Sequence, residues 1–289
     1  MPLCARTFVT IGIPVISLGR FARRQMKDFI SESWREILAH NGLADFEALW
    51  ALEAGWFETP NERRGGWSGV SRFELQRPQG GTAGVFIKRQ KNHRARTMLH
   101  PVGGVATFER EFQRIVAFQQ HGIPSLEPVF FGVRGAGRNQ RAILVTEELA
   151  GFVPLDALIA AWGRDGVPPL PARLPVIKAV AALAAKMHSC RIRHNCFSPK
   201  HVFVRIDTDG QAEARVIDLE KSRSHQLSID RCAQRDLYSL SHYSPATWRK
   251  TDRVRFLKLY LGLPRLTAEA KRLWRNVVAR SAEKDESRR

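Results

Sequence analysis

The segment between residues 188 and 201 gathers side chains that can ligate a metal ion or attack a substrate. It reads "HSCRIRHNCFSPKH" and contains His188, Cys190, His194, Cys196 and His201. Zinc binds imidazole and thiolate groups, so these residues could form a structural zinc site. Their spacings are irregular, however, and a predicted helix end, a loop and a strand start would carry them in different directions.

A second chemistry for this segment is nucleophilic catalysis, with Cys196 as nucleophile and His194 as its base. Two neighbours in sequence seldom present both groups to one substrate, and no third group that would orient the imidazole is apparent. A structural interpretation also stands. Free cysteine packs as a small apolar residue, and His194 and His201 would then be core histidines with satisfied hydrogen bonds.

Groups elsewhere in the chain indicate a third chemistry, phosphoryl transfer from ATP. This reaction needs a cover for the phosphates, a cation on them, a carboxylate that holds the cation, and metal ligands. A glycine-rich stretch at 65–69, Lys88 on a predicted strand, glutamates on the next helix and Asp218 supply these parts in that order. Each part is weak alone, because a glycine-rich stretch is usually only a turn and Glu111 could be one of many solvated helix charges.

The elements that would position these groups follow from the apolar periodicity. Helices are predicted over 28–40, 45–52 and 107–120, the last with Thr107 as N-cap and Gly122 beyond its end. Strands are predicted on both sides of the glycine turn and over 84–90 and 142–149. A long helix should end near residue 189. After it, hairpin strands at 202–206 and 214–219 should return Asp218 to the loop at 196–201.

The predicted elements divide the chain into four parts. Residues 1–25 form a basic and apolar extension, 26–149 an N-terminal lobe, 150–281 a C-terminal lobe that is helical at its end, and 282–289 a frayed charged tail. The apolar run in the extension is too short to span a membrane, and it lacks the cleavage site of a signal peptide. A true translation start at Met26 would explain the extension as a misassigned start.

Six motifs resemble those of the lipopolysaccharide kinases of the Kdo/WaaP and InaA type, over about residues 26–250. They are "GGWSGV", "FIKRQ", "FEREF", "HNCFSPKHVFV", "VIDLEKSR" and "RDLYSL". The resemblance implies an α+β, bilobal protein-kinase-like fold. Its N-lobe would hold a small antiparallel sheet and a glutamate helix, and its C-lobe would be mainly helical. ATP would be the donor, Mg²⁺ the metal, and a heptose or Kdo sugar of the lipopolysaccharide core oligosaccharide, or a lipid-linked sugar, the acceptor.

The resemblance also implies a role for each matching residue. Lys88 would bind the ATP phosphates, with Glu111 as its ion-pair partner and Glu109 as the second choice. Asp218 would be catalytic and would bind Mg²⁺ together with His201. The nucleotide-binding residues of the glycine loop and of the strand that links the lobes would be Gly65, Gly66, Ser68, Gly69, Glu147 and Leu149.

Cys196 falls where related small-molecule kinases carry the catalytic aspartate. With His194 it would line the acceptor pocket, and Asp236 would brace the loop from below. A thiol with a pKa of ~8.5 is a poor substitute for a carboxylate that takes a proton. Phosphoryl transfer depends mostly on positioning and electrostatics, so weak or altered transfer is compatible with this loop. The alternative is a catalytically impaired pseudokinase that binds nucleotide in a regulatory or stress-response role.

The charge of the chain indicates anionic partners. Its 46 Lys+Arg against 28 Asp+Glu leave a net charge of +18, which suits phosphorylated sugars or the anionic inner face of a membrane. The run over 88–100 would form an anion-recognition lip beside the phosphates, or else a solvated loop. Its cations are Lys88, Arg89, Lys91, Arg94 and Arg96.

Two further partner and compartment predictions follow from composition. Nucleic acid is not favoured, because no recognition motif or interleaved stacking aromatics accompany the charge. The four cysteines contain no CxxC pair, which predicts a reducing cytoplasm, with peripheral contact at the inner membrane.

Overall fold

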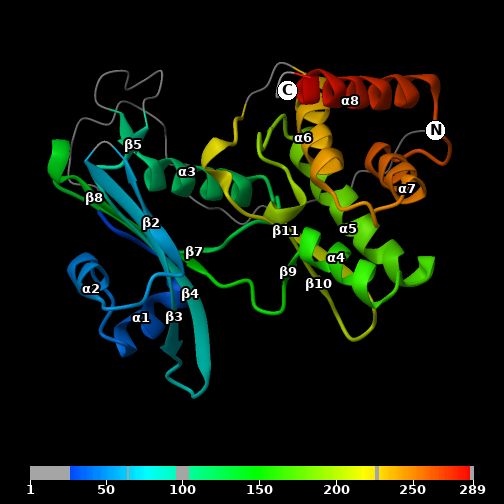
Figure 1. The fold of residues 1–289 in the computed structure, drawn as a ribbon. Helices are drawn as coiled ribbons and strands as arrows, with labels where there is room; N and C mark the ends of the chain where they lie inside the picture. The colour runs from blue at the N-terminus through cyan, green and yellow to red at the C-terminus, as the bar shows by residue number, and fades with distance from the viewer. Residues whose placement is uncertain (1–26, 64, 96–103, 225–227, 287–289) are drawn as a thin grey trace, which may run out of the picture.

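The computed structural model describes residues 27–63, 65–95, 104–224 and 228–286. Within these ranges the chain forms a lobe built around a β-sheet and a second, mainly helical lobe, with the helix α3 (Thr107–Gln120) beside the sheet and facing the second lobe (Figure 1). This is the predicted α+β, bilobal architecture.

The first lobe contains a six-stranded sheet in the order β1-β7-β8-β4-β3-β2, with every neighbouring pair antiparallel. On β4, alternate residues Ala83, Val85 and Ile87 are buried in a cluster with the helices α1 (Arg35–His40) and α2 (Phe46–Ala51). The period of two along a strand turns Lys88 to the opposite face, where α3 lies. The strands are β1 (Phe29–Ile30), β2 (Glu58–Arg63), β3 (Gly66–Gln76), β4 (Thr82–Lys91), β7 (Pro128–Arg134) and β8 (Arg141–Glu147).

The helix predicted over 28–40 was wrong in its first part. Phe29 and Ile30 form β1 and pair with Phe131 and Phe130 of β7, a short 3-10 turn follows at Glu32–Trp34, and α1 begins only at Arg35. Two adjacent apolar residues satisfy helical spacing and strand pairing equally. The edge of the sheet offers backbone hydrogen-bond partners that an isolated helix start lacks, so pairing prevails.

Helix α3 has the predicted bounds, but its start is capped differently. Ala106 is the N-cap residue and makes no side-chain cap hydrogen bond. The cap comes instead from β4, because Gln90 Oε1 accepts hydrogen bonds from Thr107 Oγ1 at 2.7 Å and from the amide of Phe108 at 3.0 Å. Thr107 is therefore the first helical residue and not the N-cap. Gly122 follows the helix with a positive φ of 60°, the conformation expected just beyond a helix end.

The second lobe is built around α5 (Leu170–Ser189), with a small sheet in the order β11-β10-β9 beside it. The tail predicted from residue 282 is helical in part, because α8 extends to Glu286. The other elements are β9 (Val153–Pro154), α4 (Leu155–Asp165), β10 (Val202–Ile206), β11 (Ala212–Val216), α6 (Ile229–Tyr243), α7 (Lys250–Leu261) and a two-stranded ribbon, β5 (Arg94–Ala95) with β6 (Val105–Ala106).

Two hydrophobic clusters form the core. One joins α1 and α2 to the outer face of the sheet. The other runs through the helical lobe and includes Ile115 and Phe118 of α3 and Leu144 of β8. Helix α3 packs on β7 and β8 of the first lobe and on the turn Leu219–Lys221 of the second, so it couples the two lobes. Among the described residues, no helix is long and apolar enough to cross a membrane.

Candidate active site

Strand β4 and helix α3 bring Lys88 and Glu111 together. Lys88 Nζ donates to Glu111 Oε1 at 2.5 Å, and the side chains are 17% and 5% exposed. Without the lysine, Glu111 would be a buried carboxylate with no countercharge, which is costly. The pair therefore fixes the ammonium in place, and two of its three N–H groups remain for an anionic ligand. The structure forms the ion pair that the sequence predicted.

Gln90 is a positioning residue that the sequence did not reveal. Its Oε1 caps α3, and its Nε2 donates to the carbonyl oxygen of His93. Because Gln90 lies two residues beyond Lys88 on the same strand, it ties the lysine strand directly to the glutamate helix. In the sequence it stands inside a basic run, where nothing distinguishes it from a solvated residue.

The glycine hairpin between β2 and β3 lies beside Lys88. Ser68 is opposite Gln90 and Val70 is opposite Lys88 in the β3–β4 register, so both share the lysine face. Gly65 forms the turn with a φ of 72°. Packing also requires glycine at position 69, because a Cβ there would lie 2.4 Å from the ring of Trp56 on the other face. The hairpin is thus placed to cover a ligand at Lys88.

Asp236 of α6 holds the loop that follows α5. Its carboxylate is fully buried, and it accepts the amide of His194 at 2.7 Å on Oδ2 and the amide of Asn195 at 2.9 Å on Oδ1. Asn195 has a φ of 69°, a left-handed conformation that costs energy unless the surroundings fix it. The two hydrogen bonds to Asp236 supply that constraint, so Asp236 braces the loop from below, as the resemblance implied.

His194 is part of the frame of the loop. It is fully buried, its Nε2 lies 2.9 Å from the carbonyl oxygen of Ile217, and its Nδ1 accepts the amide of Cys196 at 3.2 Å. Both bonds fit the neutral Nε2–H tautomer, and burial lowers the pKa of this imidazole. Neither ring nitrogen is accessible to a substrate. The structure thus moves His194 from the predicted acceptor pocket to a structural position.

His201 and Asp218 face each other across the hairpin. His201 Nδ1 lies 2.8 Å from the carbonyl oxygen of Cys196 and therefore donates to it, while Nε2 lies 3.5 Å from Asp218 Oδ2. In the neutral ring, Nε2 then carries a lone pair directed at the carboxylate. Metal-binding histidines typically donate their other ring N–H to such a carbonyl. Asp218 has a φ of 59°, a strained conformation common at functional sites.

Cys196 is half-buried, its carbonyl oxygen bonds to His201, and the charge of Asp218 acts on its thiol. Burial raises the pKa of its thiol above the usual value, and the charges of Asp218 and Asp236 raise it further, while Lys221 opposes them. The thiol therefore stays protonated at neutral pH. It can neither take a proton from an alcohol as an aspartate would nor act as a ready thiolate nucleophile.

The two halves of the site meet where α3 packs on the 3-10 turn Leu219–Lys221 that follows Asp218. Arg110 Nη2 donates to the carbonyl oxygen of Glu220 at 3.3 Å, and Nη1 lies 3.9 Å from Glu220 Oε1. Burial raises the pKa of Glu220, and the charges of both Glu111 and Asp218 raise it further. Glu111 and Asp218 thus both lie near Glu220, where α3 packs on this turn.

Comparison with known proteins identifies the family of the chain. The family model described as "Lipopolysaccharide kinase (Kdo/WaaP) family" matches residues 47–260. The chain belongs to this family. The match confirms the resemblance and covers all the residues of the site described above.

Characterised members show which proteins the chain resembles within the family. Protein InaA of Escherichia coli K12 is 35% identical over 202 residues, covering 69% of this chain and 88% of InaA. The lipopolysaccharide core heptose(I) kinase WaaP of Pseudomonas aeruginosa is 27% identical over 234 residues, covering 78% and 83%. A solved structure titled "WaaP in complex with acyl carrier protein" has a TM-score of 0.64 at 24% identity, covering 91% of this chain and 99% of that chain. The fold is therefore that of this kinase family.

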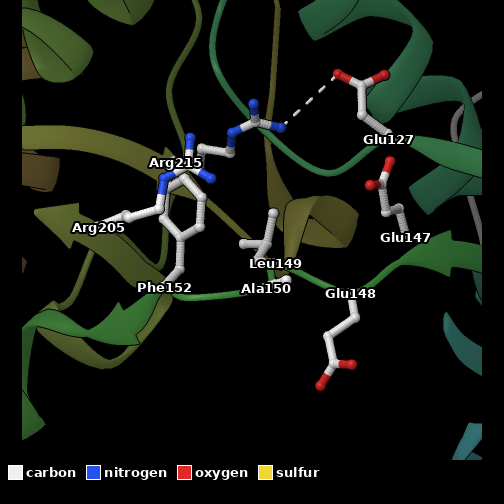
Figure 2. Close-up of a pocket in the computed structure, with 8 residues that line it drawn as sticks. All are labelled: Glu127, Glu147, Glu148, Leu149, Ala150, Phe152, Arg205 and Arg215. Atoms are coloured by element: carbon white, nitrogen blue, oxygen red, sulfur yellow. Dashed lines mark ion pairs between the residues drawn. The ribbon is translucent and has the colours of Figure 1, made fainter. Parts of the chain in front are cut away.

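A cavity beside the linker between the lobes does not include the residues predicted to bind phosphate and metal. Its volume is about 100 Å³, small for a nucleotide pocket, since ligand sites usually measure ≈ 300–1,000 Å³. Lys88, Glu111, His201 and Asp218 do not line it. Figure 2 shows the residues that do: Glu127, Glu147, Glu148, Leu149, Ala150, Phe152, Arg205 and Arg215.

The linker residues predicted to bind nucleotide turn their side chains elsewhere. Glu147 is opposite Val85 in the sheet register, on the face away from Lys88, and Leu149 packs against the core of the helical lobe. Glu148, which the sequence did not single out, turns to the lysine face. Arg72 donates to it from Nε at 2.7 Å and from Nη2 at 2.8 Å, and a Cβ on Gly84 would lie 1.8 Å from Glu148 Oε2.

The competing interpretations of residues 188–201 are not supported. His188 is buried and bonds to Tyr260 at 2.9 Å and to Asp236 at 3.2 Å, so it is not free to ligate a metal with the cysteines. In the described ranges, no group of three or more His, Cys, Asp or Glu side chains could hold a metal ion. The structure therefore favours the kinase-like interpretation of this segment over a zinc site or a Cys–His nucleophile.

Only some cations of the basic lip predicted over 88–100 lie at the surface. Arg89 is buried and donates to the carbonyl oxygens of Trp50 and Leu52 at 3.1 and 2.7 Å, so it attaches the sheet to the C-terminal end of α2. Lys91 is exposed, and Arg96 lies outside the described residues. The alternation of strand β4 decides this outcome, because it sends neighbouring cations to opposite faces.

Proposed function

We propose that the protein uses ATP to phosphorylate a hydroxyl group of a heptose or Kdo sugar in the lipopolysaccharide inner core. The observation that supports this proposal is that α3, which holds Glu111 against Lys88, packs on the turn that follows Asp218, the partner of His201. Phosphoryl transfer needs these two features, a fixed cation for the phosphates and a metal-binding pair next to it. The family supports the choice of reaction, and the named heptose kinases support the choice of acceptor class.

The residues divide the work as follows. Lys88 binds and neutralises the phosphates of ATP while Glu111 holds the lysine. Ser68, with Gly65, Gly66 and Gly69 in the hairpin, covers the phosphates. The linker at Glu147–Leu149 meets the base through its backbone. Asp218 and His201 hold the metal, whose chemistry is to neutralise charge on the transferring phosphoryl group.

The acceptor reacts without a strong base. Cys196 stands beside the metal-binding pair and orients the acceptor hydroxyl by contact, but it does not take the proton, because its thiol is already protonated. In a loose transition state the O–H bond breaks late, so the proton can pass to solvent or to an oxygen of the transferred group. The predicted rate is correspondingly low.

A second candidate function is a nucleotide-binding pseudokinase with a regulatory or stress-response role. The raised pKa of Cys196 favours it, since the group that usually takes the proton is replaced by one that cannot. InaA, whose name states no kinase activity, is 35% identical to the chain. Both candidates bind ATP with metal, so nucleotide binding alone does not separate them.

Phosphate transfer to dephosphorylated core oligosaccharide separates the two candidates. Purified wild type, Asp218→Ala and Cys196→Asp would be incubated with radiolabelled ATP and a panel of core acceptors. Transfer by wild type that is lost in Asp218→Ala supports the enzyme. No transfer by wild type over the panel supports the pseudokinase, and a gain of turnover in Cys196→Asp would show that only the base is absent.

The proposed partners follow from the acceptor and from the relatives. The core oligosaccharide or a lipid-linked sugar is the substrate, and the net charge of +18 suits peripheral contact of a cytoplasmic protein with the anionic inner-membrane face. Because the WaaP neighbour is in complex with acyl carrier protein, this chain should also be tested for that partner. Size-exclusion chromatography of the two purified proteins, alone and mixed, would detect a complex.

A further inference from the structure

Two arginines lie directly opposite each other next to the loop. Arg193 precedes His194, and Arg223 follows Asp218 by five residues. They form an antiparallel bridge in which each amide donates to the other residue's carbonyl, at 2.9 and 2.8 Å. In such a pair the Cα atoms are about 5.5 Å apart and the side chains leave on the same side. Like charges in this arrangement repel each other, which destabilises the pair.

A third arginine reaches the same place from α3. Arg114 lies three residues beyond Glu111, and its Nη1 donates to Ser224 Oγ at 3.1 Å, next to Arg223. Burial lowers the pKa of Arg114, and the charges of Arg110 and Arg223 lower it further. Burial also lowers the pKa of Arg193, with Arg235 and Arg223 adding to the effect and Asp236 opposing it.

Carboxylates do not balance this charge. Arg114, Arg193 and Arg223 form no ion pair with any Asp or Glu in the part of the chain that the structure describes. Asp236, whose charge acts on Arg193, already accepts the amides of the loop. Within the same ranges, the Nε atom of Arg193 is buried and has no hydrogen-bond partner. A guanidinium cannot lose its proton in a protein, so all three groups stay charged, and an anionic ligand would relieve their repulsion.

We propose that Arg114, Arg193 and Arg223 form a binding site for a tetrahedral phosphate dianion, either free phosphate or a phosphate monoester. Guanidinium groups present planar pairs of N–H donors that match phosphate oxygens. The three come from α3, from the start of the loop and from the segment after Asp218. A bound phosphate would therefore tie the helix that carries Glu111 to both parts of the metal-binding region. The site uses none of the residues proposed to bind ATP, and the proposal does not rest on phosphoryl transfer.

The test measures the melting temperature of the protein against inorganic phosphate at constant ionic strength. Wild type should gain about 3 °C when phosphate reaches tenfold its dissociation constant, by the ordinary linkage between binding and stability. The gain should be lost in Arg223→Gln and in Arg193→Gln. It should persist in Arg138→Gln, which removes an exposed arginine on the 3-10 turn between β7 and β8, and in Lys88→Ala.

The melting temperature without phosphate tests independently whether the arginines repel each other. Removing one member of a repelling pair should leave Arg223→Gln at least as stable as wild type in phosphate-free buffer. Arg223→Lys keeps the charge but loses the planar fork, so it should resemble wild type without phosphate and should lose most of the phosphate response. A lower melting temperature for Arg223→Gln than for wild type in phosphate-free buffer would show that this arginine is structural and would overturn the proposal.

Two probes distinguish the source of the phosphate. Inorganic phosphate and mannose 6-phosphate would be titrated in parallel against wild type and Arg223→Gln. A shift that depends on Arg223 with both probes, or with inorganic phosphate alone, assigns the site to a small oxyanion. A shift with the sugar phosphate alone assigns it to a phosphorylated sugar. No shift with either probe, or a shift that disappears in Lys88→Ala and survives in Arg223→Gln, rejects the site.

Loss of ATP binding in Lys88→Ala together with an intact phosphate response supports both this site and the nucleotide site. Failure of ATP binding in wild type would reject the proposed function while leaving the arginine site standing on its own titration.

Discussion

The imidazole of His201 points its Nε2 atom at Asp218 Oδ2, 3.5 Å away, while its Nδ1 is bound to the carbonyl oxygen of Cys196. The backbone of the loop thus decides which nitrogen of His201 faces the carboxylate. A nitrogen and an oxygen ligand side by side are an unusual pair for Mg²⁺, which prefers oxygen ligands, whereas imidazole suits first-row transition metals.

We therefore expect Mn²⁺ to support nucleotide binding better than Mg²⁺, and His201→Asn to reverse part of that preference. An asparagine offers an amide oxygen in place of the nitrogen, so the ratio of Mg²⁺ to Mn²⁺ affinity should rise about tenfold, the smaller end of effects seen at metal sites. Isothermal titration of ATP with each metal would measure it. Lys200→Ala, on the same 3-10 turn but exposed, is the control, and an unchanged ratio in His201→Asn would contradict the assignment.

Glu111→Gln should weaken ATP binding and destabilise the fold. The change keeps the shape of the side chain but removes the charge that holds Lys88, and a partly buried ion pair that loses one partner leaves the other uncompensated. We expect a loss of about 1–3 kcal/mol in the free energy of unfolding, measured by urea denaturation, and at least tenfold weaker binding of ATP with metal. Gln113→Ala, at an exposed position of the same helix, is the control, and equal effects of the two changes would contradict the pairing.

Gln90→Ala should loosen α3 without removing any charge. The cap that Gln90 places on Thr107 and Phe108 would be lost, and loss of a helix cap usually costs about 1 kcal/mol. Because Gln90 also joins the lysine strand to the glutamate helix, the ATP affinity should fall together with the stability. Hydrogen exchange of the first turn of α3 would show faster opening. Gln76→Ala, an exposed glutamine on β3, should change neither quantity.

The sequence predicted those parts of the site whose residue types are constrained by chemistry. Lys88, Glu111, His201, Asp218 and Asp236 were named from motifs, and the structure brings Lys88 to Glu111 and His201 to Asp218. A charged residue buried in a crevice needs a partner of opposite charge, so its type and order along the chain carry a signal.

The sequence missed the contacts that depend only on the relative placement of elements. Arg72 and Glu148 are 76 residues apart, and no sequence feature of either segment indicates that they pair. Gln90 and Arg89 stood together in one basic run, yet strand alternation sends one to cap α3 and the other into the outer core. At the N-terminus, Phe29 and Ile30 fitted a helix by spacing, and only the presence of the β7 edge made them a strand.

The thiol of Cys196 should be less acidic in the folded protein than in the unfolded chain. Burial raises its folded-state pKa, so below the unfolded pKa of ~8.5 both states hold the proton and stability does not change. As the pH rises through ~8.5 towards the folded pKa, the unfolded chain loses its proton first, and stability falls.

We expect alkylation of Cys196 by iodoacetamide, followed by peptide mass spectrometry, to have a pH midpoint above that of N-acetylcysteine. Cys196→Ser should flatten the fall in stability between pH 8 and 10. A midpoint below that of N-acetylcysteine would mean that a thiolate is stabilised here, and Cys196 would then be a candidate nucleophile.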